Sequence, residues 1–309
     1  MNGIVIKSTG NLCQVLSGKK TYSCKIKGKN RLNDIDFTNP VSVGDYVDFI
    51  FDLKNEIGLI ERIHDRKNYI IRKSVNLSHK SQIIASNIDL ALLVITINEP
   101  VTSFNFIDRF LVQAEAYKID AKLIFNKIDL HNEAFESVRN NYQKIYNDIG
   151  YETILTSIYD SNSISNLRRM LKNKVSVFSG HSGVGKSSLI NLIDPTLKLR
   201  TKAISTYHNQ GVHTTTYAEM FKIKSGGYII DTPGIRGLGL VDLNIDKLAG
   251  YFPEMMRESD QCKFKNCMHL NEPNCNIKKQ IEKGLIADSR YKSYLSMLEK
   301  NTNYRKNNY

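Results

Sequence analysis

A glycine-rich stretch of eight residues constrains the fold of this chain more than any other feature. Residues 180–187 read Gly-His-Ser-Gly-Val-Gly-Lys-Ser, which fits the pattern GxxxxGK[ST]. An apolar strand is expected just before it, at Val175–Ser179, and a helix just after it, at Lys186–Ile193. In that setting the glycines let backbone N–H groups turn toward a phosphate, and the helix N-terminus adds positive potential. The sequence therefore predicts a P-loop within an α/β domain.

The region around this loop has the pattern of such a domain. From about residue 88 the chain alternates expected strands and helices, which is typical of a mostly parallel sheet covered on both faces. The helical stripe of Phe106, Phe110, Ala114 and Tyr117 is interpreted as core packing. The expected strands are Leu90–Ile97, Lys122–Phe125, Thr153–Thr156, Val175–Ser179 and Tyr228–Asp231, and the expected helices are Asn105–Lys118, Glu133–Ile149, Ser163–Lys172 and the segment after Lys186.

A second motif indicates which nucleotide the P-loop would bind. Residues 126–129 read Asn-Lys-Ile-Asp, which fits the pattern NKxD at the end of an expected strand. The Asp129 carboxylate would accept hydrogen bonds from the ring N1–H and the exocyclic amine of guanine, two donors that adenine lacks. Lys127 would lie along the base, and Asn126 would tie this segment to the P-loop. Thr156 and Ser157 resemble the short loop that backs the guanine O6.

Residues near the predicted phosphates supply candidate magnesium ligands. Asp231 opens a DxxG motif that ends at Gly234, whose amide would sense the γ-phosphate. The Ser187 hydroxyl would bind Mg²⁺ directly, Asp231 would bind it through a water, and Thr215 is favoured over its neighbours as a third ligand. The predicted GTP site comprises Asn126, Lys127, Ile128, Asp129, Thr156, Ser157, Gly180, His181, Ser182, Gly183, Val184, Gly185, Lys186, Ser187, Ser188 and Gly234.

The order of these motifs along the chain is unusual. Ordinary GTPases run from the P-loop through the magnesium Thr and DxxG to NKxD and the base-backing loop. Here residues 126–129 and 156–157 precede the P-loop at 180–187 and the DxxG motif at 231–234. The cyclic order of the motifs is the same as in ordinary GTPases, but the chain begins and ends at a different point in that cycle. Folds tolerate such a permutation where the two termini of the domain lie close together. We therefore expect a circularly permuted GTPase.

Two residues near the phosphates are candidates for catalysis. Lys186 would reach the β- and γ-phosphates. A Gln after DxxG orients the attacking water in Ras-like enzymes, but Ile235 occupies that position here. His213 is the nearest candidate for that role, and an RNA contact or simple packing is the alternative for it. Without the Gln, we expect slow turnover in isolation.

A cluster of metal-binding residues follows the DxxG motif. Cys262, Cys267, His269 and Cys275 have the spacing C-x4-C-x-H-x5-C. Three thiolates and an imidazole form a closed tetrahedral zinc set, which indicates one structural rather than catalytic ion. Scattered reduced thiols are the alternative. The other two cysteines, Cys13 and Cys24, are expected in the core of the N-terminal region.

The first 63 residues differ in pattern from the rest of the chain. Short runs rich in β-branched and aromatic residues are separated by turn residues, which predicts a small β-barrel. An OB-like barrel is favoured, and an SH3-like barrel is the alternative. The expected strands are Ile4–Lys7, Leu12–Leu16, Thr21–Lys27, Tyr46–Phe51 and Ile57–Ile63.

The net charge of the chain points to a polyanionic partner. The formal charge is +12, and its surplus is concentrated in residues 1–80 and 276–309. Such clusters attract nucleic acid because neutralised phosphates release counterions. A generally basic proteome or solvated charged faces are the alternative. The predicted RNA-binding residues of the barrel are Lys19, Lys20, Lys25, Lys27, Lys29 and Arg31.

Together these features resemble one known family, the circularly permuted GTPases called ribosome small-subunit-dependent GTPase A (RsgA). The resemblance covers nearly the whole chain and includes the segment Gly211–Thr216. It implies a factor that acts late in assembly of the 30S ribosomal subunit, binds its 16S rRNA and hydrolyses GTP when the subunit stimulates it. One departure is Val212, which stands where the family pattern has Arg.

These observations predict three units. They are an OB-fold barrel that binds RNA over residues 1–70, a circularly permuted G domain over residues 71–243 and a helical zinc-binding domain over residues 244–309. We expect a cytoplasmic protein without membrane association, since neither a signal peptide nor a long apolar run is found. We also expect the protein to be a monomer. One rival hypothesis is an RNA-binding assembly clamp in which GTP tunes affinity and hydrolysis is incidental. A P-loop ATPase or kinase is disfavoured by Asn126–Asp129.

Overall fold

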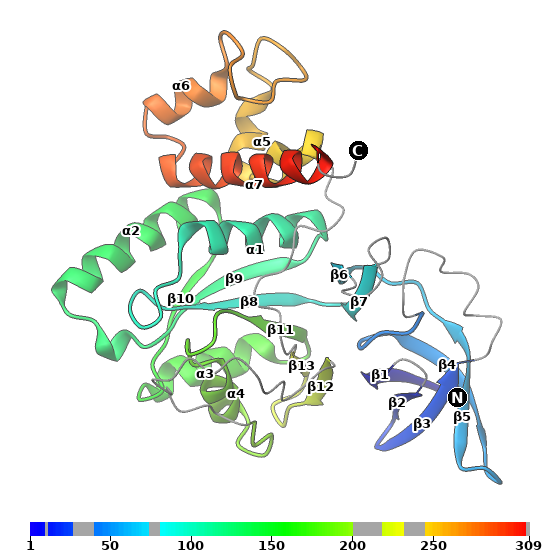
Figure 1. Cartoon of the computed structure of the whole chain (residues 1–309). Helices are drawn as coiled ribbons and strands as arrows, with labels where there is room; N and C mark the ends of the chain where they lie inside the picture. The colour runs from blue at the N-terminus through cyan, green and yellow to red at the C-terminus, as the bar shows by residue number, and fades with distance from the viewer. Residues whose placement is uncertain (10–11, 27–39, 74–80, 200–217, 232–244, 307–309) are drawn as a thin grey trace.

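The chain is organised as a central α/β domain with a β-barrel on one side and a helical C-terminal domain on another (Figure 1). The computed structural model describes residues 1–9, 12–26, 40–73, 81–199, 218–231 and 245–306. One continuous sheet of 11 strands runs through the α/β domain and the barrel. Among the described residues, no helix combines the length and the apolar character needed to cross a membrane.

The α/β domain contains a mostly parallel sheet with the strand order β10-β9-β8-β11-β13-β12. The first five strands are parallel to one another, and β12 is antiparallel to β13. Some neighbouring strands are distant in sequence: β8 pairs directly with β11. The bounds are β8 (Leu90–Ile95), β9 (Asp120–Phe125), β10 (Thr153–Leu155), β11 (Val175–Ser179), β12 (Glu219–Lys222) and β13 (Tyr228–Asp231).

Helices cover both faces of this sheet, as the alternating pattern predicts (Figure 1). All six residues of β8 are buried. Ala91, Leu93 and Ile95 belong to the core shared with α1 and α2, whereas Leu90 and Leu92 belong to the core shared with α3 and α4. The helices are α1 (Phe104–Ala116), α2 (Glu133–Ile149), α3 (Ser161–Leu171) and α4 (Lys186–Ile193).

The N-terminal strands form a closed barrel with the connectivity of an OB-fold. The strand order is β1-β2-β3-β5-β4, with β4 returning to pair with β1. β3 runs parallel to β5, a pairing that decides for the OB-like barrel over the SH3-like alternative. Cys13 and Cys24 are buried in its core, as expected. The strands are β1 (Asn2–Ser8), β2 (Leu12–Ser17), β3 (Lys20–Ile26), β4 (Tyr46–Asp52) and β5 (Ile57–Ile63).

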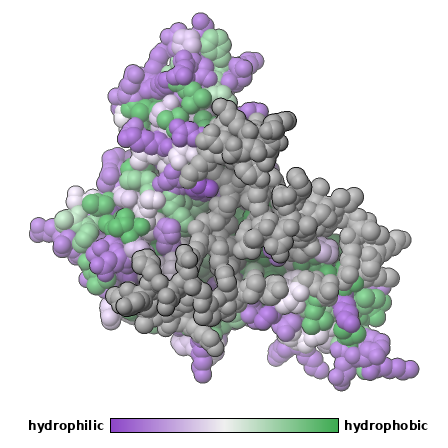
Figure 2. All heavy atoms as spheres, viewed as in Figure 1, coloured by the Kyte–Doolittle hydropathy of each residue, from purple (hydrophilic) through white to green (hydrophobic). Residues whose placement is uncertain are grey.

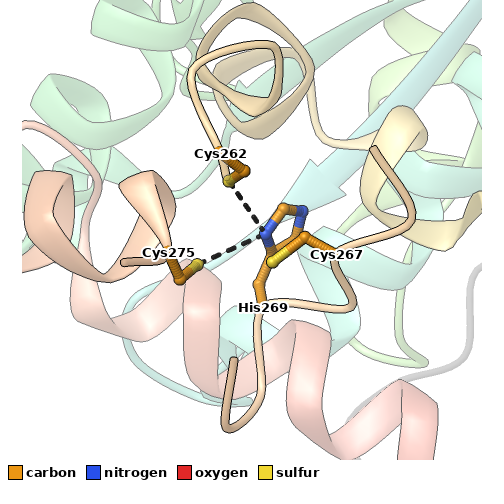
Figure 3. A group of neighbouring side chains, drawn as sticks. All are labelled: Cys262, Cys267, His269 and Cys275. Carbon is orange, nitrogen blue, oxygen red and sulfur yellow. Dashed lines mark hydrogen bonds between the residues drawn. The ribbon is translucent and has the colours of Figure 1, made fainter. Parts of the chain in front are cut away.

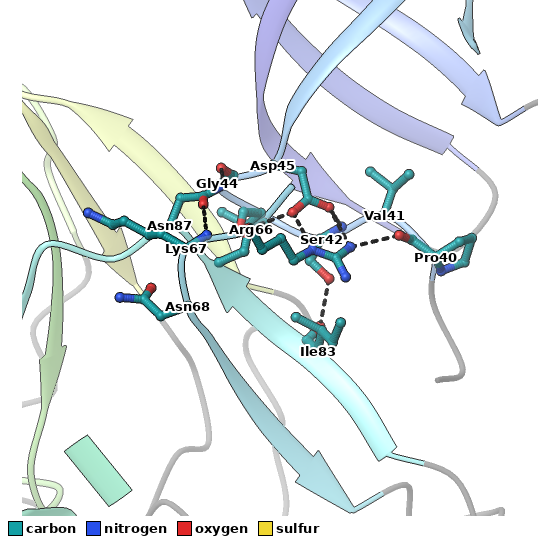
Figure 4. Close-up of polar contacts among 12 residues, drawn as sticks. Pro40, Val41, Ser42, Gly44, Asp45, Arg66, Lys67, Asn68, Ile83 and Asn87 are labelled. Atoms are coloured by element: carbon teal, nitrogen blue, oxygen red, sulfur yellow. Dashed lines mark hydrogen bonds and ion pairs between the residues drawn. The ribbon is translucent and has the colours of Figure 1, made fainter. Parts of the chain in front are cut away.

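The barrel is joined to the α/β domain by backbone pairing and by a buried carboxylate. β1 pairs with β12, where Lys7 and Glu219 lie opposite each other and form an ion pair at 3.3 Å. Asp45 is fully buried beside the junction (Figure 4) and accepts two hydrogen bonds from the Arg66 guanidinium, at 2.7 and 2.8 Å. Its carboxylate also accepts from the Ser86 hydroxyl at 2.6 Å. The barrel is therefore held in a defined position.

The sequence does not predict three of the strands. β6 (Tyr69–Lys73) and β7 (Ser81–Ser86) form a separate hairpin between the barrel and the α/β domain. Ser86, at the end of β7, supplies the Asp45 contact described above. β12 (Glu219–Lys222) is the third. All three are short and carry polar residues among the apolar ones, so they lack a distinctive pattern.

The C-terminal domain packs on the outer surface of α1 and α2 (Figure 1). It consists of the 3-10 helix η3 (Ile245–Tyr251) and the helices α5 (Pro253–Ser259), α6 (Asn276–Glu282) and α7 (Asp288–Lys306). Val112 of α1 lies within its hydrophobic core. Hydrophilic side chains cover much of the outer surface of this domain in Figure 2.

A buried ionic cluster fixes this packing. Arg290 of α7 has no exposed side-chain surface and lies 2.7 Å from the Asp108 carboxylate of α1. It also donates two hydrogen bonds to Glu254 of α5, at 2.7 and 3.1 Å. The Tyr146 hydroxyl of α2 donates to Asp108 at 2.8 Å. Burial raises the pKa of the Asp108 carboxyl, and Arg290 opposes that effect.

We expect the substitution Arg290→Met to lower the free energy of unfolding by about 3–5 kcal/mol, because it leaves two buried carboxylates without a counter-charge. Urea unfolding measures this change. The matched control is Lys292→Met on the same helix, whose ion pair with Asp288 is exposed and whose loss should cost less than about 1 kcal/mol. Equal effects of the two substitutions would contradict a structural role for the buried cluster.

Candidate functional site

The predicted P-loop connects β11 to α4 and adopts a backbone that requires glycine. Gly180 has φ +139° and Gly185 has φ +94°. A Cβ at Gly180 would lie 2.3 Å from the backbone oxygen of Val94, and one at Gly185 would lie 2.4 Å from Nδ2 of Asn126. Both positions are thus fixed by close approach of a neighbouring strand or loop as well as by the left-handed backbone.

The Asn126 side chain joins the predicted base-reading segment to this loop. Asn126 follows β9 and is 1% exposed. Its amide Nδ2 donates to the backbone oxygen of Val184 at 2.8 Å, and its Oδ1 accepts from the Thr156 hydroxyl at 2.9 Å. The sequence predicts that Asn126 contacts the P-loop, and Val184 is the P-loop residue that its amide contacts. One side chain therefore holds together the loops that follow β9, β10 and β11.

The neighbours of Asn126 are also held in place. Lys127 has a left-handed backbone with φ 61°, and its ammonium donates to the backbone oxygen of Glu99 at 2.8 Å. Asp129 is exposed, and its Oδ1 accepts from the Ser157 hydroxyl at 2.6 Å. The Ser157 hydroxyl thus helps to orient the Asp129 carboxylate.

Lys186, at the first position of α4, lies folded back over the loop. Its ammonium donates to the backbone oxygens of Gly180 and His181, at 2.7 and 2.6 Å. Burial lowers the pKa of Lys186 to about 8, although the charge of Asp231 acts in the opposite direction. A negatively charged group at this position would favour the protonated form and so would be attracted to it.

The other predicted site residues that the structure describes lie at the same edge of the sheet. Asp231 ends β13 and lies opposite Phe178 of β11 in the ladder. Ser187 and Ser188 are half-buried in the first turn of α4. The carboxyl ends of the parallel strands thus bring the segments 126–129, 156–157 and 180–188 together with Asp231, in the position where α/β sheets bind ligands. His213, Thr215 and Gly234 lie outside the described residues.

Sequence reasoning missed two contacts at this site. The Phe106 ring, on α1, stacks on the His181 imidazole of the P-loop with ring centroids 3.8 Å apart. Pro100, in the loop before α1, lies 3.5 Å from where a Cβ of Gly183 would be. Phe106 belongs to the apolar stripe of α1 and is partly buried against the core. Its spacing in the sequence therefore indicates core packing and does not reveal the contact with His181. No motif marks the loop that contains Glu99 and Pro100.

The cysteine and histidine cluster of the C-terminal domain is also assembled. The donor atoms of Cys262, Cys267, His269 and Cys275 all lie within 4.8 Å of one another (Figure 3). His269 Nδ1 is 3.7 Å from the Cys262 sulfur and 3.5 Å from the Cys275 sulfur. Three sulfurs and one imidazole nitrogen converging in this way fit a closed tetrahedral metal site.

The backbone around this cluster is held by groups outside it. The Tyr291 hydroxyl donates to the backbone oxygen of His269 at 2.6 Å, and the Tyr294 hydroxyl donates to that of Met268 at 2.7 Å. The Glu272 carboxylate accepts from the Met268 and Leu270 amides, each at 2.7 Å. Such supporting contacts orient the donors of a metal site.

Comparison with known families agrees with this geometry. A sequence model described as RsgA GTPase matches residues 63–241, and one described as RsgA N-terminal domain matches residues 2–60. The chain belongs to the RsgA GTPase family. It is therefore a GTP-hydrolysing enzyme with the permuted motif order described above.

Individual relatives cover nearly the whole chain. The small ribosomal subunit biogenesis GTPase RsgA of Flavobacterium psychrophilum is 53% identical over 97% of this chain and 93% of the relative. That of Christiangramia forsetii is 48% identical over 100% of this chain and 99% of the relative. Among solved structures, the crystal structure of YjeQ from Thermotoga maritima has a TM-score of 0.79 and 34% identity, and it covers 97% of each chain. YloQ, described as a circularly permuted GTPase, has a TM-score of 0.75 and 31% identity, and the match covers 98% of this chain and 95% of YloQ.

Three of the six basic residues predicted to bind RNA lie on the described part of the barrel of this RsgA family member. Lys19, Lys20 and Lys25 are exposed on β3 and on the turn that precedes it. Lys27, Lys29 and Arg31 lie outside the described residues.

Proposed function

We propose that this enzyme hydrolyses GTP at the P-loop site while it takes part in late assembly of the small ribosomal subunit. The observation that supports the nucleotide site best is the Asn126 side chain, which joins the Asn126–Asp129 segment to the P-loop through Val184 at 2.8 Å. In this proposal Asp129 reads the guanine N1–H and amine, and Lys127 flanks the base. Thr156 and Ser157 back the guanine O6.

The phosphates lie in this proposal against the backbone N–H groups of residues 180–188, with the Gly234 amide as a further contact. Lys186 then exchanges its contacts with the Gly180 and His181 oxygens for the β- and γ-phosphates. Ser187, Thr215 and, through a water, Asp231 would hold Mg²⁺, which neutralises charge that develops on the phosphates. His213 would orient the attacking water.

The proposed partner is the 30S subunit with its 16S rRNA. The curated relatives at about this level of identity are named small ribosomal subunit biogenesis GTPases. The exposed Lys19, Lys20 and Lys25 of the barrel offer positive charge to RNA phosphates. In this proposal the chain acts as a cytoplasmic monomer that needs no membrane. Residues 1–70 serve as the RNA-binding unit, residues 71–243 as the GTPase and residues 244–309 as the zinc-binding unit.

GTP hydrolysis with and without purified subunits tests the proposed partner. We expect slow turnover by the protein alone, since Ile235 stands where Ras-like enzymes have the water-orienting Gln. Small subunits should raise the rate by at least about tenfold, which corresponds to about 1.4 kcal/mol of barrier. Large subunits at the same concentration are the control. Equal rates with both particles would contradict the proposal, and binding to small subunits without stimulation would favour the assembly clamp.

We further propose that Cys262, Cys267, His269 and Cys275 bind one structural Zn²⁺. Elemental analysis of the purified protein should show about one zinc per chain, and Cys267→Ser should lower that content and destabilise the C-terminal domain. Cys13→Ser is the control, because Cys13 lies in the barrel core and should leave the zinc content unchanged. Wild-type protein without zinc, or full zinc content in Cys267→Ser, would contradict this assignment.

A further inference from the structure

The contact between Phe106 and His181 joins helix α1 to the first half of the P-loop. The two rings are stacked, with an interplanar angle of 28° and centroids 3.8 Å apart. Burial and the nearby Lys186 charge both lower the pKa of His181, which favours the neutral imidazole. His181 also offers its backbone oxygen to the Lys186 ammonium at 2.6 Å. The ring that Phe106 contacts thus belongs to a residue that already positions Lys186.

The P-loop is held at three places by different elements. Asn126 holds its second half through the Val184 oxygen. β8 lies against its start, where a Cβ at Gly180 would meet the Val94 oxygen at 2.3 Å. Phe106 holds the His181 side chain between these two points. Phosphate binding requires the loop N–H groups to point inward together, so each contact favours the conformation that binds nucleotide.

Helix α1 is itself firmly anchored on its other sides. Two residues before Phe106, Phe104 stacks on Tyr142 of α2 with ring centroids 3.9 Å apart. Two residues after it, Asp108 forms the buried ion pair with Arg290. The Asn105 amide donates to the Ser296 hydroxyl of α7 at 2.9 Å. Phe106 is therefore presented to the loop from a rigid support.

We propose that Phe106 is a positioning residue for the nucleotide site, which acts by holding His181 and with it the first half of the P-loop in the conformation that binds phosphate. This inference rests on the proposed role of residues 180–188 in binding GTP. Phe106 does not contact the nucleotide in this account. Its effect is to raise the fraction of the free protein whose loop is ready to bind, and the apparent dissociation constant is inversely proportional to that fraction.

The expected consequence is a loss of affinity that does not depend on the γ-phosphate. The loop is common to the GDP and GTP complexes, so Phe106→Leu should weaken both equally, by roughly 3- to 10-fold for the loss of one aromatic stack. For the same reason KM for GTP should rise while kcat at saturating GTP changes little. Phe106→Tyr keeps the ring and should restore wild-type affinity.

The test is isothermal titration of the full-length protein with GDP and with a non-hydrolysable GTP analogue. The matched control is Phe104→Leu, which removes an equally close stack from the same helix but on the α2 side, and it should change affinity by less than about twofold. His181→Gln should cause the same loss as Phe106→Leu, and the double variant should lose no more than either single variant.

Three results would overturn the inference. These are unchanged GDP affinity in Phe106→Leu, an equal loss in Phe104→Leu, and additive losses in the double variant. If Phe106→Leu does not fold, His181→Gln decides, because unchanged affinity in that variant also overturns the inference. Wild-type protein that binds neither GDP nor the analogue would instead contradict the proposed nucleotide site itself.

Discussion

The proposed nucleotide site depends on the contacts of one buried side chain, that of Asn126. Its amide donates to the Val184 oxygen, its carbonyl accepts from Thr156, and a glycine is required at position 185 because Asn126 lies so close. Three loops from three strands meet at this one side chain. These loops are spread over more than fifty residues of the sequence. The contacts of Asn126, rather than nearness in the sequence, therefore bring them together. The parallel strands then align Asp231 with the same edge.

The other domains are attached to the α/β domain by contacts between residues that are distant in sequence. β8 and β11 pair in the middle of the sheet although a long segment separates them in sequence. The N-terminal barrel joins this sheet through the pairing of β1 with β12 and through the Asp45 cluster. The C-terminal domain follows the last strand in sequence but packs on α1, where Arg290 reaches Asp108. Helix α1 thus contacts the P-loop with Phe106 and the C-terminal domain with Asp108, and it supports both.

Much of this architecture could be predicted because its signals are local. The P-loop has its glycines within eight residues, and the apolar run of β8 marks a strand buried on both faces. The spacing of Cys262, Cys267, His269 and Cys275 marks a group that could hold a metal ion. The choice of an OB-fold depended on the parallel pairing of β3 with β5, which no local pattern encodes. Arg290 resembles a surface residue in the sequence, because only tertiary packing brings Asp108 and Glu254 to it. Phe106 has a core periodicity, and its stack on His181 depends on how α1 is rotated.

The central claim is that the Asn126–Asp129 segment reads guanine, and nucleotide selectivity of Asp129→Asn tests it most directly. Asp129 should accept two hydrogen bonds from guanine, so the variant should lose affinity for GTP by about a hundredfold or more. It should gain affinity for xanthosine triphosphate, which carries a carbonyl where guanine has its amine. The control is Asp160→Asn, the same chemical change at the N-cap of α3, which should leave both affinities unchanged. Wild-type GTP affinity in Asp129→Asn, with no gain for xanthosine triphosphate, would contradict the account.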